Sequence, residues 1–162
     1  MPESILKGKR ILAVDDEPDV LTILEEEILG AAPNCIFEKT TTYKEAAKKL
    51  ESQSYDVVIL DIMGVRGFDL LESAVKRNFR VAMLTAHALN VEALNRSFKM
   101  RAMAYLPKEN LGHIVPFLED VLKYEYLPSW KRLMEKSKRF FDSKFEPGWE
   151  KKTDLPWEVF GL

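Results

Sequence analysis

Short apolar runs alternate with stretches of helical periodicity along the first 124 residues. Five runs have the length and composition of strands, at residues 10–14, 35–39, 55–61, 80–85 and 103–106. The third contains Val57-Val58-Ile59-Leu60 without a polar interruption, which is typical of a strand buried on both faces. The segments between and after the runs favour helices, at residues 18–31, 45–50, 68–75, 91–100 and 110–124.

Polar side chains stand at the carboxyl ends of four of these runs. Regular alternation of strand and helix predicts an α/β fold, in which helices cover both faces of a parallel five-stranded sheet. The carboxyl ends of parallel strands lie along one edge of such a sheet. The residues at these ends are Asp15 and Asp16, Asp61, Thr85 and Lys108. We therefore expect carboxylates, a hydroxyl and an ammonium to converge at this edge.

This combination of groups suits one kind of chemistry. Clustered carboxylates repel one another, and a hard divalent cation such as Mg²⁺ relieves the repulsion. A carboxylate beside Mg²⁺ and a lysine can attack an activated phosphorus and form an acyl phosphate. In this interpretation Asp61 is the nucleophile, while Thr85 and Lys108 contact the phosphoryl oxygens. Each residue alone has an ordinary alternative, such as a helix cap or a solvated charge, but their common position favours a functional site.

A second amphipathic signal follows residue 124, after a predicted break at residues 127–129. The apolar side chains between residues 130 and 145 fall on one helical face, formed by Trp130, Leu133, Met134, Phe140, Phe141 and Phe145. We therefore predict a domain at residues 1–124 and a C-terminal helical extension with a tail at residues 125–162. The extension is too short for a winged-helix output domain. Its apolar face could fold back on the domain, pair with a second subunit or dock a partner protein, and folding back is favoured.

Composition and charge exclude several classes of protein. The one cysteine, Cys35, lies in an apolar stretch and allows no disulfide framework. The sequence has no long uncharged apolar run, and its formal net charge of −2 gives no general attraction to nucleic acid. These features predict a cytoplasmic protein that binds neither nucleic acid nor membranes.

The residues at the strand ends resemble the signature of the receiver domain of two-component response regulators. The match consists of Asp15-Asp16, Asp61, Thr85-Ala86 and Tyr105-Leu106-Pro107-Lys108. The resemblance covers residues 9–124. It implies a doubly wound, flavodoxin-like sheet with strand order 2-1-3-4-5, to which the C-terminal amphipathic helix is added.

The resemblance also implies a role for each matching residue. Asp61 would be the phosphoacceptor. The Mg²⁺ ligands would be Asp15, Asp16, Asp61 and the backbone carbonyl of Met63. The phosphate-binding and switch residues would be Thr85, Ala86, Tyr105 and Lys108. Met63 and His87 stand at positions from which a side chain could tune the site.

The implied function is bacterial-type two-component signalling. A histidine kinase or phosphotransfer protein would phosphorylate Asp61. The face formed by the fourth and fifth helices and the fifth strand would then change and bind a downstream protein or a second copy. Such a protein is not an enzyme, apart from Mg²⁺-dependent self-phosphorylation and autodephosphorylation.

Two stretches depart from the family pattern. Val65 takes the place of a proline that follows the phosphoacceptor, and the loop at residues 62–67 is shorter than usual. Lys108 is preceded by Pro107 and followed by Glu109, where the family has Lys-Pro. The geometry of the loop and the position of Lys108 therefore stay open.

Two alternative functions stay open, and the departures support the first of them. The first is a phosphorylation-independent receiver-like scaffold or dimerisation module, which acts through the C-terminal helix. The second is a phosphohydrolase in which Asp61 turns over as the nucleophile. The phosphohydrolase is disfavoured because the residue two positions after Asp61 is Met63, which supplies no second carboxylate as a general acid.

Overall fold

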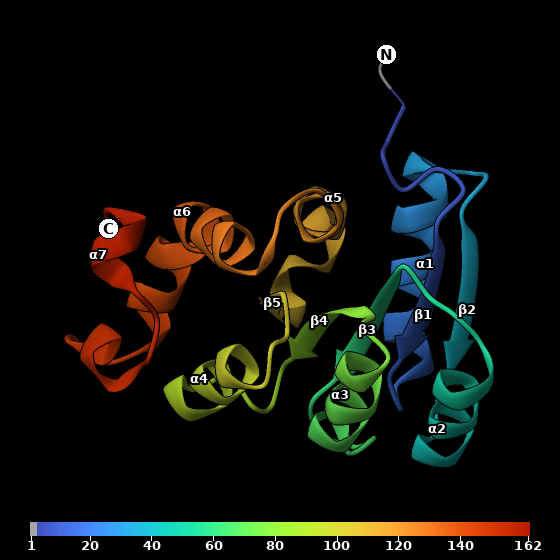
Figure 1. The fold of residues 1–162 in the computed structure, drawn as a ribbon, viewed down its shortest axis with the longest axis horizontal. Helices are drawn as coiled ribbons and strands as arrows, with labels where there is room; N and C mark the ends of the chain where they lie inside the picture. The colour runs from blue at the N-terminus through green and yellow to red at the C-terminus, as the bar shows by residue number, and fades with distance from the viewer. Residues whose placement is uncertain (1–2) are drawn as a thin grey trace.

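The computed structural model describes residues 3–162, which form a parallel five-stranded sheet and its surrounding helices (Figure 1). The strands are β1 (Arg10–Val14), β2 (Ile36–Thr40), β3 (Val57–Asp61), β4 (Arg80–Thr85) and β5 (Ala104–Pro107). They lie in the order β2-β1-β3-β4-β5, and every neighbouring pair is parallel. The predicted fold class and the order 2-1-3-4-5 are confirmed.

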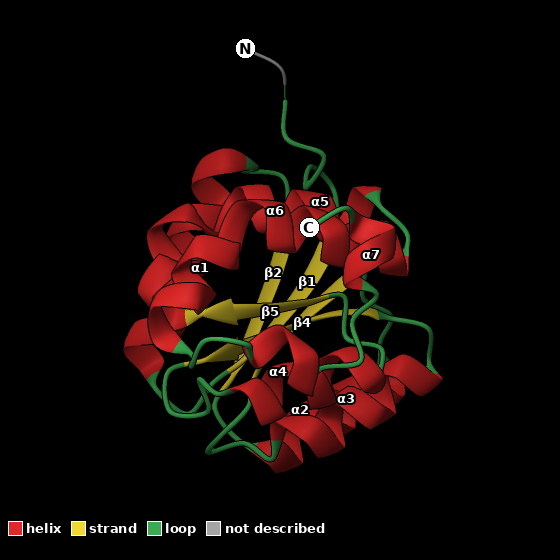
Figure 2. Ribbon diagram, turned by 90° about the vertical axis from the view of Figure 1, so that its left-hand side faces the viewer, coloured by secondary structure: helices red, strands yellow, loops and turns green. Residues whose placement is uncertain are grey.

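Helices cover both faces of the sheet (Figure 2). One face carries α1 (Pro18–Ala31) and α5 (Ile114–Lys123), and the other carries α2 (Tyr43–Ser52), α3 (Gly67–Lys76) and α4 (Val91–Lys99). Local chemistry sets several helix starts. Pro18 occupies the first turn of α1, where its missing N–H would have no partner in the helix. Thr42 and Asn90 cap α2 and α4 by accepting hydrogen bonds from backbone N–H groups.

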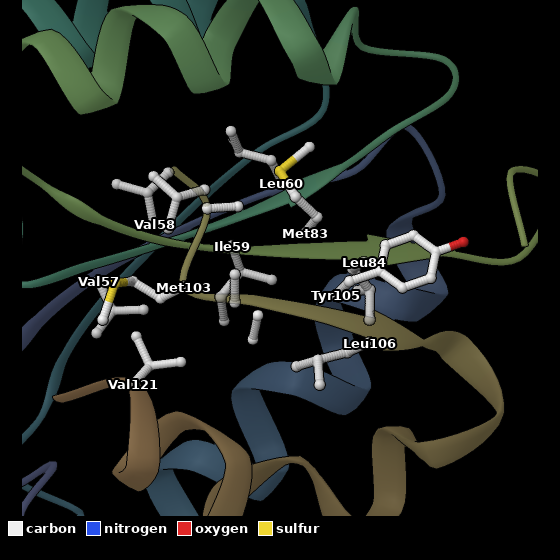
Figure 3. Close-up of a cluster of buried hydrophobic side chains, with 14 of the residues drawn as sticks. Val57, Val58, Ile59, Leu60, Met83, Leu84, Met103, Tyr105, Leu106 and Val121 are labelled. Carbon is white, nitrogen blue, oxygen red and sulfur yellow. The ribbon is translucent and has the colours of Figure 1, made fainter. Parts of the chain in front are cut away.

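The central strand β3 is buried along its whole length, as its unbroken apolar run predicts. Figure 3 shows its side chains in one buried cluster with those of the neighbouring strand β4 and of β5. The adjacent residues Tyr105 and Leu106 point to opposite sides of β5, so that each contributes to a different face. Because β3 is packed on both faces, the residue at its end, Asp61, is held by the core of the protein.

Two predicted boundaries near the C-terminus are wrong. Residues 127–129 do not interrupt the helical structure, because they lie within α6 (Tyr126–Lys144). Pro128 is tolerated there since it lies in the first turn, where backbone N–H groups have no partner within the helix. The fifth helix was predicted from residue 110, but α5 begins only at Ile114 and is preceded by a 3₁₀ segment, η1 (Lys108–His113). Within residues 3–162, no helix combines the length and the apolar character that crossing a membrane requires.

The C-terminal segment, residues 125–162, folds back on the rest of the chain beside α4, β5 and α5 (Figure 1). It contains α6, the 3₁₀ segment η2 (Trp149–Lys152) and the short helix α7 (Trp157–Phe160). The predicted apolar face points inward: Trp130, Leu133, Met134 and Phe141 are buried, and Phe140 and Phe145 are half-buried against the same core. Of the three arrangements considered for this face, the structure shows the folded-back one.

Helix α6 covers β5, which is an edge strand of the sheet. Ser129 Oγ donates a hydrogen bond of 3.0 Å to the carbonyl of Met103, and Trp130 Nε1 donates one of 2.7 Å to the carbonyl of Ala102. The hydroxyl of Tyr126 donates to the carbonyl of Phe98 at the end of α4. The C-terminal segment therefore bonds to carbonyls of the chain that leads from α4 into this edge strand.

We predict that Trp130 contributes strongly to the stability of the whole protein. Its ring is 0% exposed, so Trp130→Ala leaves a large cavity and should lower the free energy of unfolding by about 3–5 kcal/mol in urea denaturation. Val159→Ala is the control, because Val159 is 73% exposed and its truncation should change stability by less than about 0.5 kcal/mol. A Trp130→Ala protein as stable as this control would show that the segment does not fold as part of the core.

Candidate functional site

The polar residues predicted at the strand ends meet at one edge of the sheet. Asp15 follows β1, and Asp61 and Thr85 are the last residues of β3 and β4. In the strand register, Asp61 pairs with Leu84, and Thr85 pairs with Pro107, the residue before Lys108. Parallel pairing therefore brings these groups to the same level of the sheet, although they are far apart in the sequence.

Lys108 joins this cluster as an ammonium between two buried carboxylates. Its Nζ lies 2.9 Å from Asp15 Oδ2 and 3.2 Å from Asp61 Oδ1, and its side chain is only 9% exposed. Glu17 Oε1 lies further away, at 3.7 Å. The described chain contains no cis peptide bond, so Lys108 reaches the site from the first position of η1 with an ordinary trans backbone. The missing Lys-Pro sequence does not displace it.

Burial and charge shift the pKa of all three groups. Burial, followed by repulsion from Asp15, raises the pKa of Asp61 to about 7, although Lys108 opposes the change. Burial also raises the pKa of Asp15, and the neighbouring ammonium offsets this only in part. Burial alone would lower the pKa of Lys108, but the two carboxylates outweigh it and the pKa lies above its ordinary value. One buried ammonium is therefore not enough to neutralise the carboxylates around it.

Three of the carboxylates are close enough together to hold a metal ion. Asp15, Asp16 and Asp61 each offer an oxygen, and these oxygens lie within 4.8 Å of one another. Asp15 Oδ2 is buried and, despite its ion pair with Lys108, meets no donor in hydrogen-bond geometry. An all-oxygen site with excess negative charge fits a hard cation such as Mg²⁺.

The short loop after Asp61 depends on two glycines. Gly64 has a φ of +88°, and a side chain there would place Cβ only 2.5 Å from Asp16 Oδ2. At Gly67 a Cβ would lie 2.2 Å from the carbonyl oxygen of Asp61. Gly67 N–H closes the loop by donating to the carbonyl of Ile62 at 3.1 Å. Only glycine permits these approaches, so the loop can be short and still leave room for Asp16.

Thr85 and Tyr105 are connected through the backbone of one residue, Ala88. The N–H of Ala88 donates to Thr85 Oγ1 at 2.8 Å, and the hydroxyl of Tyr105 donates to the carbonyl of Ala88. Asn90 N–H in turn donates to the Tyr105 hydroxyl at 3.1 Å. Tyr105 is fully buried, and its pKa is raised by that burial. The two predicted switch residues thus belong to one hydrogen-bonded chain.

The remaining predicted residues lie around the rim of the site. Met63 is 53% exposed on the loop after Asp61. Ala86 and His87 are exposed in the loop between β4 and α4, directly after Thr85. None of these three packs into the carboxylate cluster, although the backbone of Met63 adjoins the glycine that borders Asp16.

Sequence reasoning missed three residues that shape this site. Gly64 and Gly67 belong to the loop at residues 62–67, and nothing in the sequence showed that they lie against Asp16 and against the carbonyl of Asp61. Ala88 acts through its backbone, so its residue type carries no signal at all.

Comparison with known proteins assigns the chain to a family. Residues 11–115 match the family described as the response regulator receiver domain. The chain belongs to this family. The receiver is also 40% identical over 88 residues to the two-component response regulator ARR18 of Arabidopsis thaliana. That match covers 50% of this chain and 13% of the plant protein, so the chain corresponds to a small part of this relative.

Solved structures agree with the receiver fold. A CheY-like receiver domain protein from Methanospirillum hungatei JF-1 has a TM-score of 0.56 and 25% identity, covering 89% of this chain and 98% of its own. A response regulator from Chloroflexus aurantiacus J-10-fl has a TM-score of 0.63 and 23% identity, over 73% and 100% of the two chains. The BeF3-activated DrrB receiver domain has a TM-score of 0.61 and 19% identity, over 72% and 98%.

We predict that Gly64 is needed for cation binding by this receiver. Gly64→Ala would push the carboxylate of Asp16 away from Asp15 and Asp61, and we expect Mg²⁺ affinity to fall about 10- to 100-fold in calorimetric titration. Gly30→Ala is the matched control, since a Cβ on Gly30 meets nothing within 4 Å. Equal Mg²⁺ affinity for the two variants would show that Asp16 takes no part in the cation site.

The raised pKa of Asp61 predicts a pH-dependent stability in the absence of divalent ions. The folded protein keeps a proton on Asp61 up to about pH 7, whereas the unfolded chain loses it near the ordinary value of 3.8. Stability should therefore fall as the pH rises through this interval. Asp61→Asn removes the titrating group, so at about pH 8 it should be more stable than wild type by up to about 4 kcal/mol in urea denaturation with EDTA.

The control for this experiment is Asp69→Asn, because Asp69 is exposed on α3. This variant should follow the pH profile of wild type. If Asp61→Asn has the same stability as wild type at about pH 8, the ionised carboxylate of Asp61 does not destabilise the folded protein, and the predicted rise of its pKa is wrong.

Proposed function

We propose that this receiver is a phosphorylation-dependent signalling module that accepts a phosphoryl group on Asp61. The observation that carries the proposal is the buried cluster in which Lys108 lies between Asp15 and Asp61. Asp61 stands at the end of the buried central strand, with Oδ1 3.2 Å from Lys108 Nζ and a carboxylate oxygen within 4.8 Å of oxygens of Asp15 and Asp16. These are the groups that phosphoryl transfer to a carboxylate requires.

Each residue of the cluster has a distinct part in the proposed transfer. A carboxylate oxygen of Asp61 attacks the phosphorus of the donor and forms the acyl phosphate, while the donor's leaving group departs with the bonding electron pair. Lys108 Nζ, released from its pairing with the Asp61 oxygen, neutralises a phosphoryl oxygen. Thr85, one position beyond the register partner of Asp61, donates a hydrogen bond to another phosphoryl oxygen.

A magnesium ion fits the remaining negative charge of the site. Asp15, Asp16, Asp61 and the backbone carbonyl of Met63 would hold it, and it would neutralise charge on the phosphoryl group when bound. Gly64 keeps the space that the carboxylate of Asp16 needs.

The proposed partners follow from this chemistry. A histidine kinase or a phosphotransfer protein supplies the phosphoryl group, and a downstream protein or a second copy reads the altered surface. The backbone of Ala88 bonds to both Thr85 and Tyr105. If the hydroxyl of Thr85 turns toward the phosphoryl group, the hydrogen bonds of the loop that leads into α4 therefore change. We assign this role to residues 1–124 as the receiver unit and treat residues 125–162 as its extension. With a single, buried cysteine the fold needs no disulfide and hence no oxidising compartment, and we place the protein in the cytoplasm.

We propose a phosphoacceptor rather than a phosphohydrolase that turns over an external substrate. The position two residues after Asp61 carries the exposed thioether of Met63, which cannot act as a general acid. Release of the phosphoryl group would then depend on water that reaches the acyl phosphate past Met63 and His87.

The test of this function is the mass of the intact protein after incubation with a small-molecule phosphodonor and Mg²⁺. Wild type should gain one phosphoryl group, and Asp61→Asn should gain none because the amide is not a nucleophile. Asp69→Asn, an exposed carboxylate on α3, is the control and should be labelled like wild type. Labelling of Asp61→Asn to the wild-type level would place the phosphoryl group on another residue.

A further inference from the structure

The C-terminal segment seals Tyr105 inside the protein. The ring of Phe141 in α6 lies 5.9 Å from the ring of Tyr105, and both residues are 0% exposed. Phe141 also stacks on Phe145 at 5.5 Å, and Phe145 contacts Trp149 at 5.2 Å. A row of aromatic rings therefore runs from β5 into the C-terminal segment.

Burial under Phe141 restricts the hydroxyl of Tyr105. A buried hydroxyl without a partner costs about 1–3 kcal/mol, so this group must find its hydrogen bonds within the protein. It finds them in the loop before α4, where it donates to the Ala88 carbonyl and accepts from Asn90 N–H. The same position of Ala88 directs its N–H to Thr85 Oγ1. Docking of α6 thus holds Thr85 through Tyr105 and Ala88.

The segment is also attached at places that do not involve Tyr105. Trp130 and Ser129 bond to carbonyls before β5, and Lys136 Nζ lies 2.6 Å from Asp120 Oδ2 on α5. Asp154 and Asn95 of α4 exchange two hydrogen bonds, of 2.8 and 2.9 Å. The contact between Phe141 and Tyr105 can therefore loosen while these attachments keep the segment on the protein.

We propose that the C-terminal segment is an intramolecular regulator of the phosphorylation site, with Phe141 as the residue that couples the two. The proposal rests on Asp61 being the phosphoacceptor. When Thr85 turns its hydroxyl toward a phosphoryl group, the N–H of Ala88 loses its acceptor. This disturbs the loop whose Ala88 carbonyl accepts the hydrogen bond of the buried Tyr105 hydroxyl. The docked segment opposes that disturbance. Because coupling between two sites is reciprocal, phosphorylation weakens the docking of α6 to the same degree.

The test uses beryllofluoride with Mg²⁺, a noncovalent analogue of the phosphoryl group whose binding reaches equilibrium. We expect Phe141→Ala and the milder Phe141→Leu to bind it more tightly than wild type, with Phe141→Ala at about fivefold or more. Phe160→Ala is the matched control, since Phe160 is a buried ring of the same segment whose aromatic neighbour is Trp157, 6.2 Å away. This control should bind beryllofluoride with the affinity of wild type.

A double-mutant cycle with Tyr105→Phe tests the route of the coupling. This substitution removes the hydroxyl that joins Tyr105 to Ala88 and keeps the ring against Phe141. In the Tyr105→Phe background, Phe141→Ala should therefore change beryllofluoride affinity less than twofold. An undiminished effect of Phe141→Ala in that background would overturn the proposed route.

The remaining outcomes separate the regulator from the underlying function. Amide hydrogen exchange in α6 should become faster when wild type is saturated with beryllofluoride. If wild type binds beryllofluoride but the Phe141 variants bind it equally well and exchange in α6 is unchanged, the regulatory role is overturned while the phosphoacceptor site stands. If wild type binds no beryllofluoride in the presence of Mg²⁺, both proposals fail.

Discussion

The ion cluster of Lys108 with Asp15 and Asp61 is the interaction on which the site depends. Its ammonium is nearly buried, and the pKa of both carboxyl groups stays raised despite it, so ionising both of them is unfavourable until a further cation balances their charge. A buried pair of this kind contributes little to stability, because desolvation offsets the attraction between the charges. Its role is to hold the carboxylates and the ammonium at positions where they can bind a cation and the oxygens of a phosphoryl group.

The sheet supplies the rigidity that this cluster requires. Buried β3 fixes Asp61 from both faces, and the two glycines of the following loop bring the chain close to Asp16 and to the carbonyl of Asp61. The two glycines therefore allow a short loop to pack against the site without displacing Asp16 or Asp61. Val65, at the position of the usual proline, is 1% exposed and anchors the loop in the core.

Sequence patterns predicted the sheet and the convergence of the strand-end residues, because unbroken apolar runs indicate buried parallel strands and the carboxyl ends of such strands lie along one edge. Residues 127–129 were mispredicted, since a proline ends a helix in the interior but is tolerated in its first turn. The position of Lys108 could not be predicted without the family's Lys-Pro, and only the 3₁₀ turn of η1 showed how it reaches the carboxylates. Ala88 escaped prediction because backbone groups, rather than its side chain, join Thr85 to Tyr105.

The central claim, that Asp61 carries the phosphoryl group, is tested most directly by mapping the modified residue in wild type. Reduction of an acyl phosphate with borohydride converts that aspartate to homoserine, which peptide mass spectrometry can locate. After treatment with a phosphodonor and Mg²⁺, we predict homoserine at position 61 and unchanged aspartates at positions 15 and 16. Homoserine at another position, or none in protein that has gained the phosphoryl mass, would contradict the assignment.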